Sequence, residues 1–362
     1  MKDKKKLVYV LHDIALGGAE VALLSAVPAL NEKYFLKIIV LGTVNQDLIN
    51  NFTETEKRAF VSFNYPFYLY PFVLPRIIRA ILDFDPEIMV CSLWRASLVG
   101  VFVKRLNSKI KFFSFNHSTR FPHKLSAFFT RAAAKTADVI LTDGIATRDF
   151  VRDKLNPGAP IRTVSFLTNP TPTFIKNRKV GPAREVKFMF LGRINKVKNL
   201  PLVVDTIRYL RDRGVAATLD VYGRNDGDIS ETIAAIDVAK IQDHIQFKGE
   251  VSMEERMSLF DRYDFYIQLS TFEGMAMSVA EAMQHGLVCV VSPVGEIVHY
   301  AKDMESAIFI DISSEDRRQS DMKKIYEVVV DESLYERLSV NCHQNFLQKP
   351  RYADSLVEEL EK

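Results

Sequence analysis

The chain has 362 residues, 48% of them hydrophobic and 26% charged, which is enough for two or three globular domains that each bury a core. With 15 Gly, 14 Pro and 3 Cys, the composition excludes disordered, collagen-like and disulfide-stapled proteins. The net charge of +3 conceals a basic first half, because residues 1–170 hold 23 Lys and Arg against 14 Asp and Glu, whereas residues 171–362 hold 25 against 31.

The first half alternates short apolar runs with helix-length segments, which predicts a parallel α/β domain. We expect strands at 7–12, 36–41, 87–92, 110–114 and 139–142, and helices at 19–30, 98–106 and 123–136. Aromatic residues crowd residues 60–72, where Pro66 and Pro71 interrupt them. Because proline disrupts a regular strand, we expect an irregular loop there.

The alternation lapses over residues 169–186, a segment with three prolines and the basic residues Lys176, Arg178 and Lys179, which we interpret as an interdomain linker. A second α/β series follows, with strands at 186–191, 218–222, 245–248, 265–268 and 287–292 and helices at 200–213, 278–285 and 352–361. We therefore predict an N-terminal domain over 1–172, joined by the C-terminal segment 347–362, and a second domain over 173–346.

Polar or glycine-rich features follow the predicted strands in both halves. They are Gly17-Gly18, His117, Gly192-Arg193 with Lys198, Gly223, and the pair Glu273 and Glu281. Ligands of open parallel sheets bind beyond the carboxyl ends of the strands. The shared placement therefore predicts one ligand cleft between two domains.

Two of these features suit a phosphate. Gly17-Gly18 leads into a helix N-terminus, where free amides attract anions, although a tight turn between strand and helix explains a glycine pair equally well. Arg193 and Lys198 offer a planar fork and a compact charge to a diphosphate that departs in a reaction, and two solvated loop cations are the simpler alternative.

The two glutamates are expected on one helix that starts at Glu273-Gly274. Eight residues of helix rise about 12 Å, so Glu273 and Glu281 would not meet as an acid and base pair. They would bind separate hydroxyl groups of an extended ligand, or simply be surface glutamates of an amphipathic helix.

The stretch from Glu273 to Glu281 resembles the Glu-x7-Glu signature of retaining glycosyltransferases of the GT-B type, specifically glycosyltransferase family 4, also described as glycosyl transferases group 1. Residues 192–198 resemble the diphosphate-binding segment of that family, residues 16–20 its glycine loop, residues 115–119 its histidine segment and residues 137–143 a strand late in its first domain. The resemblance runs from about residue 5 to 311 and implies two Rossmann-like domains with parallel sheets facing each other across a cleft.

The resemblance also implies roles for single residues. Glu281 would hold the ribose of a nucleotide-sugar, Arg193 and Lys198 its diphosphate, and the backbone of Val251 its base. Glu273 and the backbone amides of the next four residues would hold the donor sugar, Gly17 and Gly18 would close over the phosphates, and His117 would lie at the reacting bond. Those four residues are Gly274, Met275, Ala276 and Met277. Gly223, which follows a predicted strand, is a further candidate for donor binding.

The sequence departs from the family at Ala276, where Gly or Pro is common, and in the shortened segment 292–298. These departures concern the sugar pocket. We expect no metal ion and no cofactor beyond a UDP- or GDP-linked sugar as co-substrate. Asp83-Phe84-Asp85 precedes its strand, and Asp226-Gly227-Asp228 reads more simply as a polar loop, so neither Asp-x-Asp triplet is favoured as a metal site.

The basic first half favours an anionic partner, with chance variation as the alternative. Aromatic residues lie beside Arg76 and Arg79, and Phe128-Phe129 lies among Lys124, Arg131 and Lys135. Such mixtures favour a membrane interface or an apolar acceptor over nucleic acid, although core aromatics and a solvated helix face would look similar. The apolar run after Lys6 is too short for a signal peptide, which together with the scattered cysteines predicts a cytoplasmic protein, peripheral at the inner face of the plasma membrane.

The expected function is therefore sugar transfer with retained configuration from a nucleotide-sugar to a lipid-linked or saccharide acceptor, in the synthesis of surface polysaccharide, lipopolysaccharide or glycolipid. Two alternatives stay open. One is a nucleotide-sugar epimerase or hydrolase on the same scaffold, and the other is a non-catalytic partner subunit of this architecture. The oligomeric state is not predicted.

Overall fold

The computed structural model describes residues 4–362 except 16, 122, 182 and 228. The chain forms two compact units, one from Met1–Pro170 with Pro350–Lys362 and the other from Thr171–Lys349. Each is an α/β unit around a parallel sheet, as predicted. Leu16 and Asp228, which belong to the predicted glycine loop and to one Asp-x-Asp triplet, lie outside the described residues.

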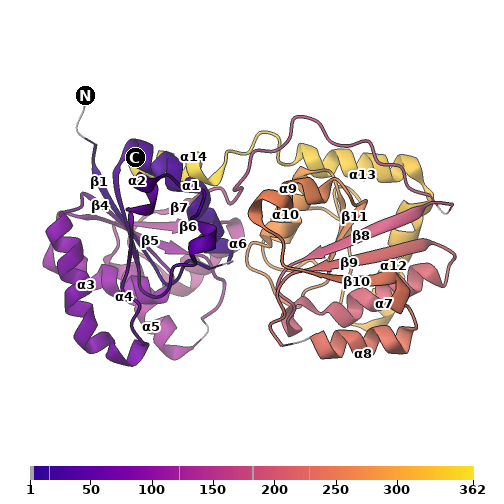
Figure 1. Ribbon diagram of the computed structural model, residues 1–362, viewed down its shortest axis with the longest axis horizontal. Coiled ribbons are helices and arrows are strands. Elements are labelled where there is room, and N and C mark those ends of the chain that lie inside the picture. Colours follow the sequence, from indigo (N-terminus) through magenta and orange to yellow (C-terminus); the bar gives the residue numbers. More distant parts are fainter. Residues whose placement is uncertain (1–3, 16, 122, 182, 228) are drawn as a thin grey trace. The chain divides into compact units, whose positions relative to one another are not determined.

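Unit 1 holds a sheet of seven strands in the order β3-β2-β1-β4-β5-β6-β7. Figure 1 labels β1 and β4 to β7 of this sheet together with the helices around it. The strands are β1 (Lys6–Leu11), β2 (Phe35–Val40), β3 (Phe60–Ser62), β4 (Ile88–Ser92), β5 (Lys111–Asn116), β6 (Val139–Thr142) and β7 (Ile161–Thr163). The helices are α1 (Gly18–Lys33), α2 (Glu54–Lys57), α3 (Tyr70–Phe84), α4 (Trp94–Leu106), α5 (Lys124–Thr136), α6 (Ile145–Phe150) and α14 (Tyr352–Glu361), with short turns η1 (Gln46–Leu48), η2 (Phe67–Leu69) and η3 (Val151–Leu155).

Both faces of this sheet are covered, which explains why its central strands are apolar throughout rather than alternating. Side chains that point one way along β1, such as Tyr9, pack with α1 and the C-terminal helix α14. Their neighbours, such as Val8 and Val10, pack with α3, α4 and α5 on the other face. The chain end therefore completes the core of the first unit.

Unit 2 holds a sheet of six strands in the order β10-β9-β8-β11-β12-β13. The strands are β8 (Glu185–Leu191), β9 (Ala216–Tyr222), β10 (Ile245–Gly249), β11 (Phe265–Gln268), β12 (Val288–Val291) and β13 (Ile308–Phe309). The helices are α7 (Leu200–Arg211), α8 (Ile229–Ala239), α9 (Met253–Phe260), α10 (Met277–Gln284), α11 (Ile297–Tyr300), α12 (Glu315–Val330) and α13 (Glu332–Gln344), with turns η4 (Lys196–Lys198) and η5 (Gln242–His244).

Alternation along β11 shows how this sheet positions a helix. Phe265 and Ile267 point into the core shared with α7 and α12. Tyr266 points to the other face, where its hydroxyl lies 2.8 Å from the hydroxyl of Ser278 on α10 and 3.0 Å from the carbonyl oxygen of Leu191. Helix α10 is thereby fixed against the ends of β8 and β11.

Two predictions of local structure were wrong. Residues 60–72 do not form an irregular loop throughout, because they contain β3 and the start of α3, whose first turn accommodates a proline without losing a helical hydrogen bond. Glu273 does not start a helix, because α10 begins only at Met277 after a left-handed residue, so Glu273 and Glu281 are not joined by regular helix. Within the described residues, we find no helix long and apolar enough to cross a membrane.

Candidate functional site

The carboxyl ends of β8 and β11 bring two predicted site residues together. The Nζ atom of Lys198 lies 2.7 Å from the Oε1 atom of Glu273, and both side chains are largely buried. The amide of Gln268, the last residue of β11, donates to the same oxygen at 3.0 Å. A buried carboxylate needs such partners, and here they fix Glu273 with its charge compensated.

The loop from Glu273 to α10 is held close by its surroundings. Ala276, the residue before the helix, has φ +52°, a left-handed conformation that favours glycine. Gly295 has φ +62°, and a Cβ atom there would lie 2.4 Å from the carbonyl oxygen of Glu273, so only glycine fits against this loop. The loop between Glu273 and Met277 is therefore tightly shaped, with Met275 and Ala276 buried and Gly274 half-buried.

Glu281 lies one turn into α10 and has a partner that the sequence did not reveal. The guanidinium Nη2 of Arg256, on α9, lies 2.8 Å from its Oε2 atom. Burial raises the pKa of the Glu281 carboxyl above its ordinary value, and the positive charge of Arg256 opposes that rise. Arg256 therefore favours the ionised form of a carboxylate that is almost fully buried.

Arg193 does not share a partner with Lys198. Its Nη1 atom lies 3.5 Å from the carboxylate of Asp226, which also pairs with Arg224 at 2.9 Å, and its side chain is mostly exposed. The segment that holds Arg193 and the segment that holds Asp226 meet at two glycines. Gly223, at φ +135°, lies so close to Gly192 that a Cβ atom on Gly223 would lie 1.8 Å from the Gly192 carbonyl oxygen.

Val251 is half-buried and lies just beyond β10, two residues before α9. The carbonyl oxygen of Gly249 accepts a hydrogen bond from the backbone of Gly223 at 2.8 Å. This contact links the segment that holds Val251 to the segment that holds Gly223.

In unit 1, His117 lies just after β5 between two partners. Its Nε2 atom lies 2.7 Å from the hydroxyl of Ser92, at the end of β4, and its Nδ1 atom lies 3.1 Å from the carboxylate of Asp143, just after β6. Gly17 has an extended backbone as the N-cap of α1, and Gly18 is the first residue of that helix. Neither glycine has the positive φ for which a tight turn between strand and helix would need glycine.

His12, which follows β1, is a second imidazole at this edge of the sheet. Its Nε2 atom accepts a hydrogen bond from the backbone of Arg95 at 2.8 Å, and so it caps α4, whose own N-cap residue, Leu93, provides no side-chain acceptor. Burial first, and then the positive charge of Arg95, lower the pKa of His12 to about 3.

Residues 173–344, which make up nearly all of unit 2, match the family described as glycosyl transferases group 1. The C-terminal unit belongs to the glycosyl transferases group 1. A curated relative, GDP-mannose:cellobiosyl-diphosphopolyprenol alpha-mannosyltransferase from Xanthomonas oryzae pv. oryzae, is 27% identical over 89 residues. That match spans 25% of this chain and 23% of the relative.

Solved structures resemble the chain over nearly its whole length. HepE from Anabaena, in complex with UDP and glucose, has a TM-score of 0.80 at 12% identity and covers 99% of this chain and 100% of its own. Sucrose-phosphate synthase from Thermosynechococcus elongatus has a TM-score of 0.79 at 14% identity, with 99% and 98% covered. At such identity the likeness establishes the fold alone, which is that of GT-B glycosyltransferases, as predicted.

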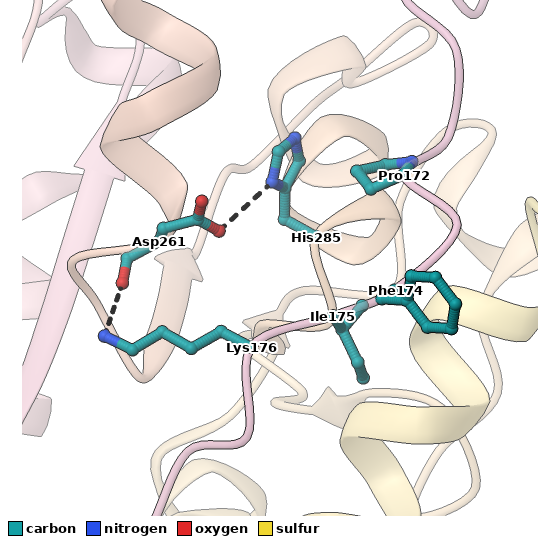
Figure 2. Close-up of a pocket in the computed structure, with 6 residues that line it drawn as sticks. All are labelled: Pro172, Phe174, Ile175, Lys176, Asp261 and His285. Atoms are coloured by element: carbon teal, nitrogen blue, oxygen red, sulfur yellow. Dashed lines mark hydrogen bonds and ion pairs between the residues drawn. The ribbon is translucent and has the colours of Figure 1, made fainter.

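The group 1 unit also has a cavity of about 510 Å³ at the other end of α10 (Figure 2). It is lined by Pro172, Phe174, Ile175, Lys176, Asp261 and His285. Figure 2 shows Lys176 donating to the backbone oxygen of Asp261, whose carboxylate faces the imidazole of His285. None of the predicted donor residues lines this cavity.

Near the cavity, the group 1 unit buries Arg178, which we had assigned to the interdomain linker. Its guanidinium donates to the carbonyl oxygens of Phe260, Tyr263 and His285, at the ends of α9 and α10. A cation suits helix carboxyl ends, whose last carbonyl groups carry partial negative charge.

Several partners could not be found from the sequence pattern. Arg256, Asp143 and Ser92 each lie 25 residues or more from the group that they contact. Among the residues that the structure describes, no group of three or more His, Cys, Asp or Glu side chains is arranged to hold a metal ion. Asp226 pairs instead with Arg193 and Arg224.

Proposed function

We propose that the chain is a retaining glycosyltransferase that moves a sugar from a UDP- or GDP-sugar to a lipid-linked or saccharide acceptor. One observation carries this proposal. The unit that matches glycosyl transferases group 1 places Lys198 and Glu273 within 2.7 Å of each other beyond the carboxyl ends of its strands, where ligands of such sheets bind.

The donor would bind by exchanging partners with the charged groups already there. Lys198 would turn from Glu273 toward the diphosphate, and Arg193 would leave Asp226 for the same group. Glu273, freed in part from Lys198, would accept hydrogen bonds from hydroxyl groups of the sugar. The backbone amides of residues 274–277 would face the other side of the sugar. These two cations would stabilise the departing diphosphate, so the proposed reaction requires no metal ion.

The other end of the donor would meet α9 and α10. Glu281, whose ionised form Arg256 favours, would accept hydrogen bonds from the ribose hydroxyl groups, and the backbone of Val251 would contact the base. Gly223 and the pair Gly17 and Gly18 would leave room for the phosphates. His117 would lie beside the donor sugar, near the reacting bond. The departing phosphate would take the proton of the acceptor hydroxyl.

The names of related proteins support both the proposed donor and the proposed acceptor. The Xanthomonas relative is named for a GDP-mannose donor, a diphosphopolyprenol-linked acceptor and an alpha product. The Anabaena structure holds UDP and glucose, and the lipopolysaccharide outer core galactosyltransferase WaaB has a TM-score of 0.72 at 13% identity, with 98% of this chain and 99% of its own covered. These names favour synthesis of surface polysaccharide, lipopolysaccharide or glycolipid.

We also propose that unit 1 binds an anionic membrane surface. Large apolar side chains are exposed on α3 and α5, which cover one face of its sheet, and on the turn η2 before α3, among them Tyr68, Phe72 and Phe128. Basic residues lie on the same helices, at Arg76 and Arg79 of α3 and at Lys124, Arg131 and Lys135 of α5. Exposed aromatics with cations are typical of an interfacial surface. Flotation with anionic vesicles at low salt tests this point, and a double variant Phe72→Ser with Phe128→Ser should float less.

The decisive experiment follows donor consumption and product with and without acceptor. Transfer with retained anomeric configuration supports the proposal, and an inverted product contradicts it. Consumption of donor without any acceptor would favour an epimerase or hydrolase. Absence of turnover with every UDP- and GDP-sugar would favour a non-catalytic partner subunit.

A further inference from the structure

Unit 1 contains a chain of hydrogen bonds that runs through three neighbouring strand ends. Ser92 ends β4, His117 directly follows β5 and Asp143 directly follows β6, and these three strands are adjacent in the sheet. The Ser92 hydroxyl lies 2.7 Å from His117 Nε2, His117 Nδ1 lies 3.1 Å from the Asp143 carboxylate, and Thr147 donates to the other Asp143 oxygen at 2.9 Å.

The hydrogen-bonding capacities of these groups allow one arrangement for a neutral imidazole beside an ionised carboxylate. A carboxylate accepts only, so the hydrogen of the imidazole must lie on Nδ1, which donates to Asp143. Nε2 is then an acceptor, and the Ser92 hydroxyl must donate to it. Thr147 uses its own hydrogen on Asp143, which fixes the orientation of the carboxylate.

Packing holds the imidazole in the same orientation. The Phe115 ring lies 4.1 Å from the His117 ring at an angle of 28°, and Phe115 in turn stacks on Tyr352 of the C-terminal helix. The side chains of His117 and Asp143 are about one tenth exposed, and Ser92 is buried. A ring restrained by stacking and at both nitrogens has little freedom to turn over.

We propose that Asp143 is a positioning residue that holds the Nδ1 hydrogen of His117, so that Nε2 stays an acceptor for one substrate hydroxyl, whose place Ser92 takes in the free protein. The identity of that hydroxyl, on the transferred sugar or its acceptor, rests on the proposed glycosyltransferase function. The tautomer does not, because it follows from contacts within unit 1. His117 thus receives a hydrogen bond from substrate rather than giving one.

The first test reads the tautomer directly, from nitrogen-15 chemical shifts of the imidazole rings in the full-length protein. The chain has 7 histidines, and loss of one signal set in His117→Gln assigns His117. We expect the wild type to carry its hydrogen on Nδ1. In Asp143→Asn the new amide can donate to Nδ1, and we expect the hydrogen to move to Nε2, as replacement of the orienting aspartate does in serine proteases.

The second test reads the consequence for turnover. Asp143→Asn should lower kcat by about 10- to 100-fold, because Nε2 would then present a donor to a substrate hydroxyl and a buried hydrogen bond would be left unmade. Its affinity for UDP or GDP alone should be unchanged, because Asp143 is not among the residues proposed to contact the nucleotide, and the side chains proposed to hold its ribose and diphosphate lie in unit 2. Asp149→Asn, on the same segment but paired with Arg148 and Arg152 at the surface, is the matched control and should behave as wild type.

The outcomes separate this inference from the proposed function. A wild-type spectrum with the hydrogen on Nε2 overturns the inference without any variant, even if Asp143→Asn fails to fold. A tautomer change in Asp143→Asn with wild-type kcat overturns the positioning role. Absence of sugar transfer by the wild type overturns the proposed function, whereas the tautomer result still decides whether Asp143 orients His117.

Discussion

The two units differ in the contacts that hold polar side chains at the carboxyl ends of their strands. In unit 2 the charged residues predicted to hold the donor are paired with one another or with a neighbour, as in Lys198 with Glu273 and Glu281 with Arg256. In unit 1 the imidazoles are held by single hydrogen bonds at each ring nitrogen, as in His117, or as a helix cap, as in His12.

The difference teaches what each site must do when a ligand arrives. A diphosphate that binds to unit 2 replaces the carboxylate in an existing ion pair. The free energy of binding is therefore the difference between the attraction of the cation to the diphosphate and its attraction to that carboxylate, not the full attraction of a free cation. A hydroxyl that reaches unit 1 replaces one neutral hydrogen bond by another. Charge governs affinity in the first case, and orientation governs reactivity in the second.

The largest expected effect comes from Lys198→Ala, which removes the largely buried cation beside Glu273. We expect kcat for sugar transfer to fall by about 10²–10³-fold, the range for loss of one group that stabilises developing charge. Lys196→Ala is the matched control, because Lys196 lies on the same turn but is mostly exposed and pairs with Glu231 at 3.3 Å. Steady-state kinetics, with circular dichroism to verify folding, decide the point, and equal losses in both variants would contradict it.

Arg256→Met tests the second ion pair through its pH dependence. Burial raises the pKa of Glu281, and without Arg256 that pKa rises further, so more of the carboxyl is protonated at neutral pH. At a pH below the pKa, each further unit by which the pKa rises lowers the ionised fraction about tenfold. That change is equivalent to about 1.4 kcal/mol in the free energy of ionisation. Calorimetry should therefore show weak binding of UDP or GDP at pH 6 that recovers as pH rises.

The control for this experiment is Glu281→Gln, whose nucleotide affinity should be low at every pH because no carboxylate remains to titrate. If Arg256→Met binds nucleotide as wild type does across the pH range, Arg256 does not control the ionisation of Glu281.

His12 tests unit 1 by stability rather than by activity. Its pKa is lowered to about 3 in the folded protein from an ordinary 6.5, so its contribution to stability is complete above about pH 6.5 and is lost as pH falls toward 3. The free energy of unfolding of unit 1 should fall by up to about 1.4 kcal/mol per pH unit in that window through this group. In His12→Gln, which keeps an acceptor for the Arg95 backbone, the fall should be shallower.

The single tryptophan, Trp94, lies 5.8 Å from His12 and makes its fluorescence a probe of unit 1 during urea unfolding. His299→Gln, which alters an exposed imidazole in unit 2, should leave the slope with pH unchanged. Equal slopes in wild type and His12→Gln would exclude His12 as the titrating group.

The smallest expected effect concerns backbone conformation before α10. Ala276 pays for its left-handed conformation at φ +52°, a cost of about 1–2 kcal/mol for a residue with a Cβ atom, whereas glycine adds about 0.5–1 kcal/mol of conformational entropy. Ala276→Gly should therefore raise the free energy of unfolding of unit 2 by about 0.5–1 kcal/mol in urea titrations. A loss of stability would show that contacts of the Ala276 side chain outweigh the strain.

Most of the architecture could be predicted from the sequence because buried parallel strands are short continuous apolar runs. The strand at 139–142 and the closing helix at 352–361 have the expected bounds. Segment 60–72 could not, because Pro66 and Pro71 disfavour both strand and helix by local rules, whereas a proline in the first helical turn sacrifices no hydrogen bond.

The individual residues of the candidate site were predicted from the sequence, but the contacts between them were not. Lys198 and Glu273 were each proposed from local motifs, but they lie 75 residues apart and their contact depends on β8 and β11 being neighbours in the sheet. Arg256 carried no local signal, since a basic residue in a short amphipathic helix is ordinarily a solvated one. The helical spacing proposed for Glu273 and Glu281 failed because Ala276 adopts a conformation that composition does not reveal.

Arg178 has a practical consequence for anyone who recombines these units. Thr171 and Lys176 bond to Phe346 and Asp261, and Arg178 joins the ends of α9 and α10, so the segment after Thr171 is built into the group 1 unit rather than being an interchangeable tether. The opposite end of α10, about 12 Å away by helical rise, begins at the residues proposed to hold the donor sugar. A chimera should therefore have its junction before Thr171. A junction after Arg178 would replace the residues whose contacts hold the end of α10, the helix that carries Glu281.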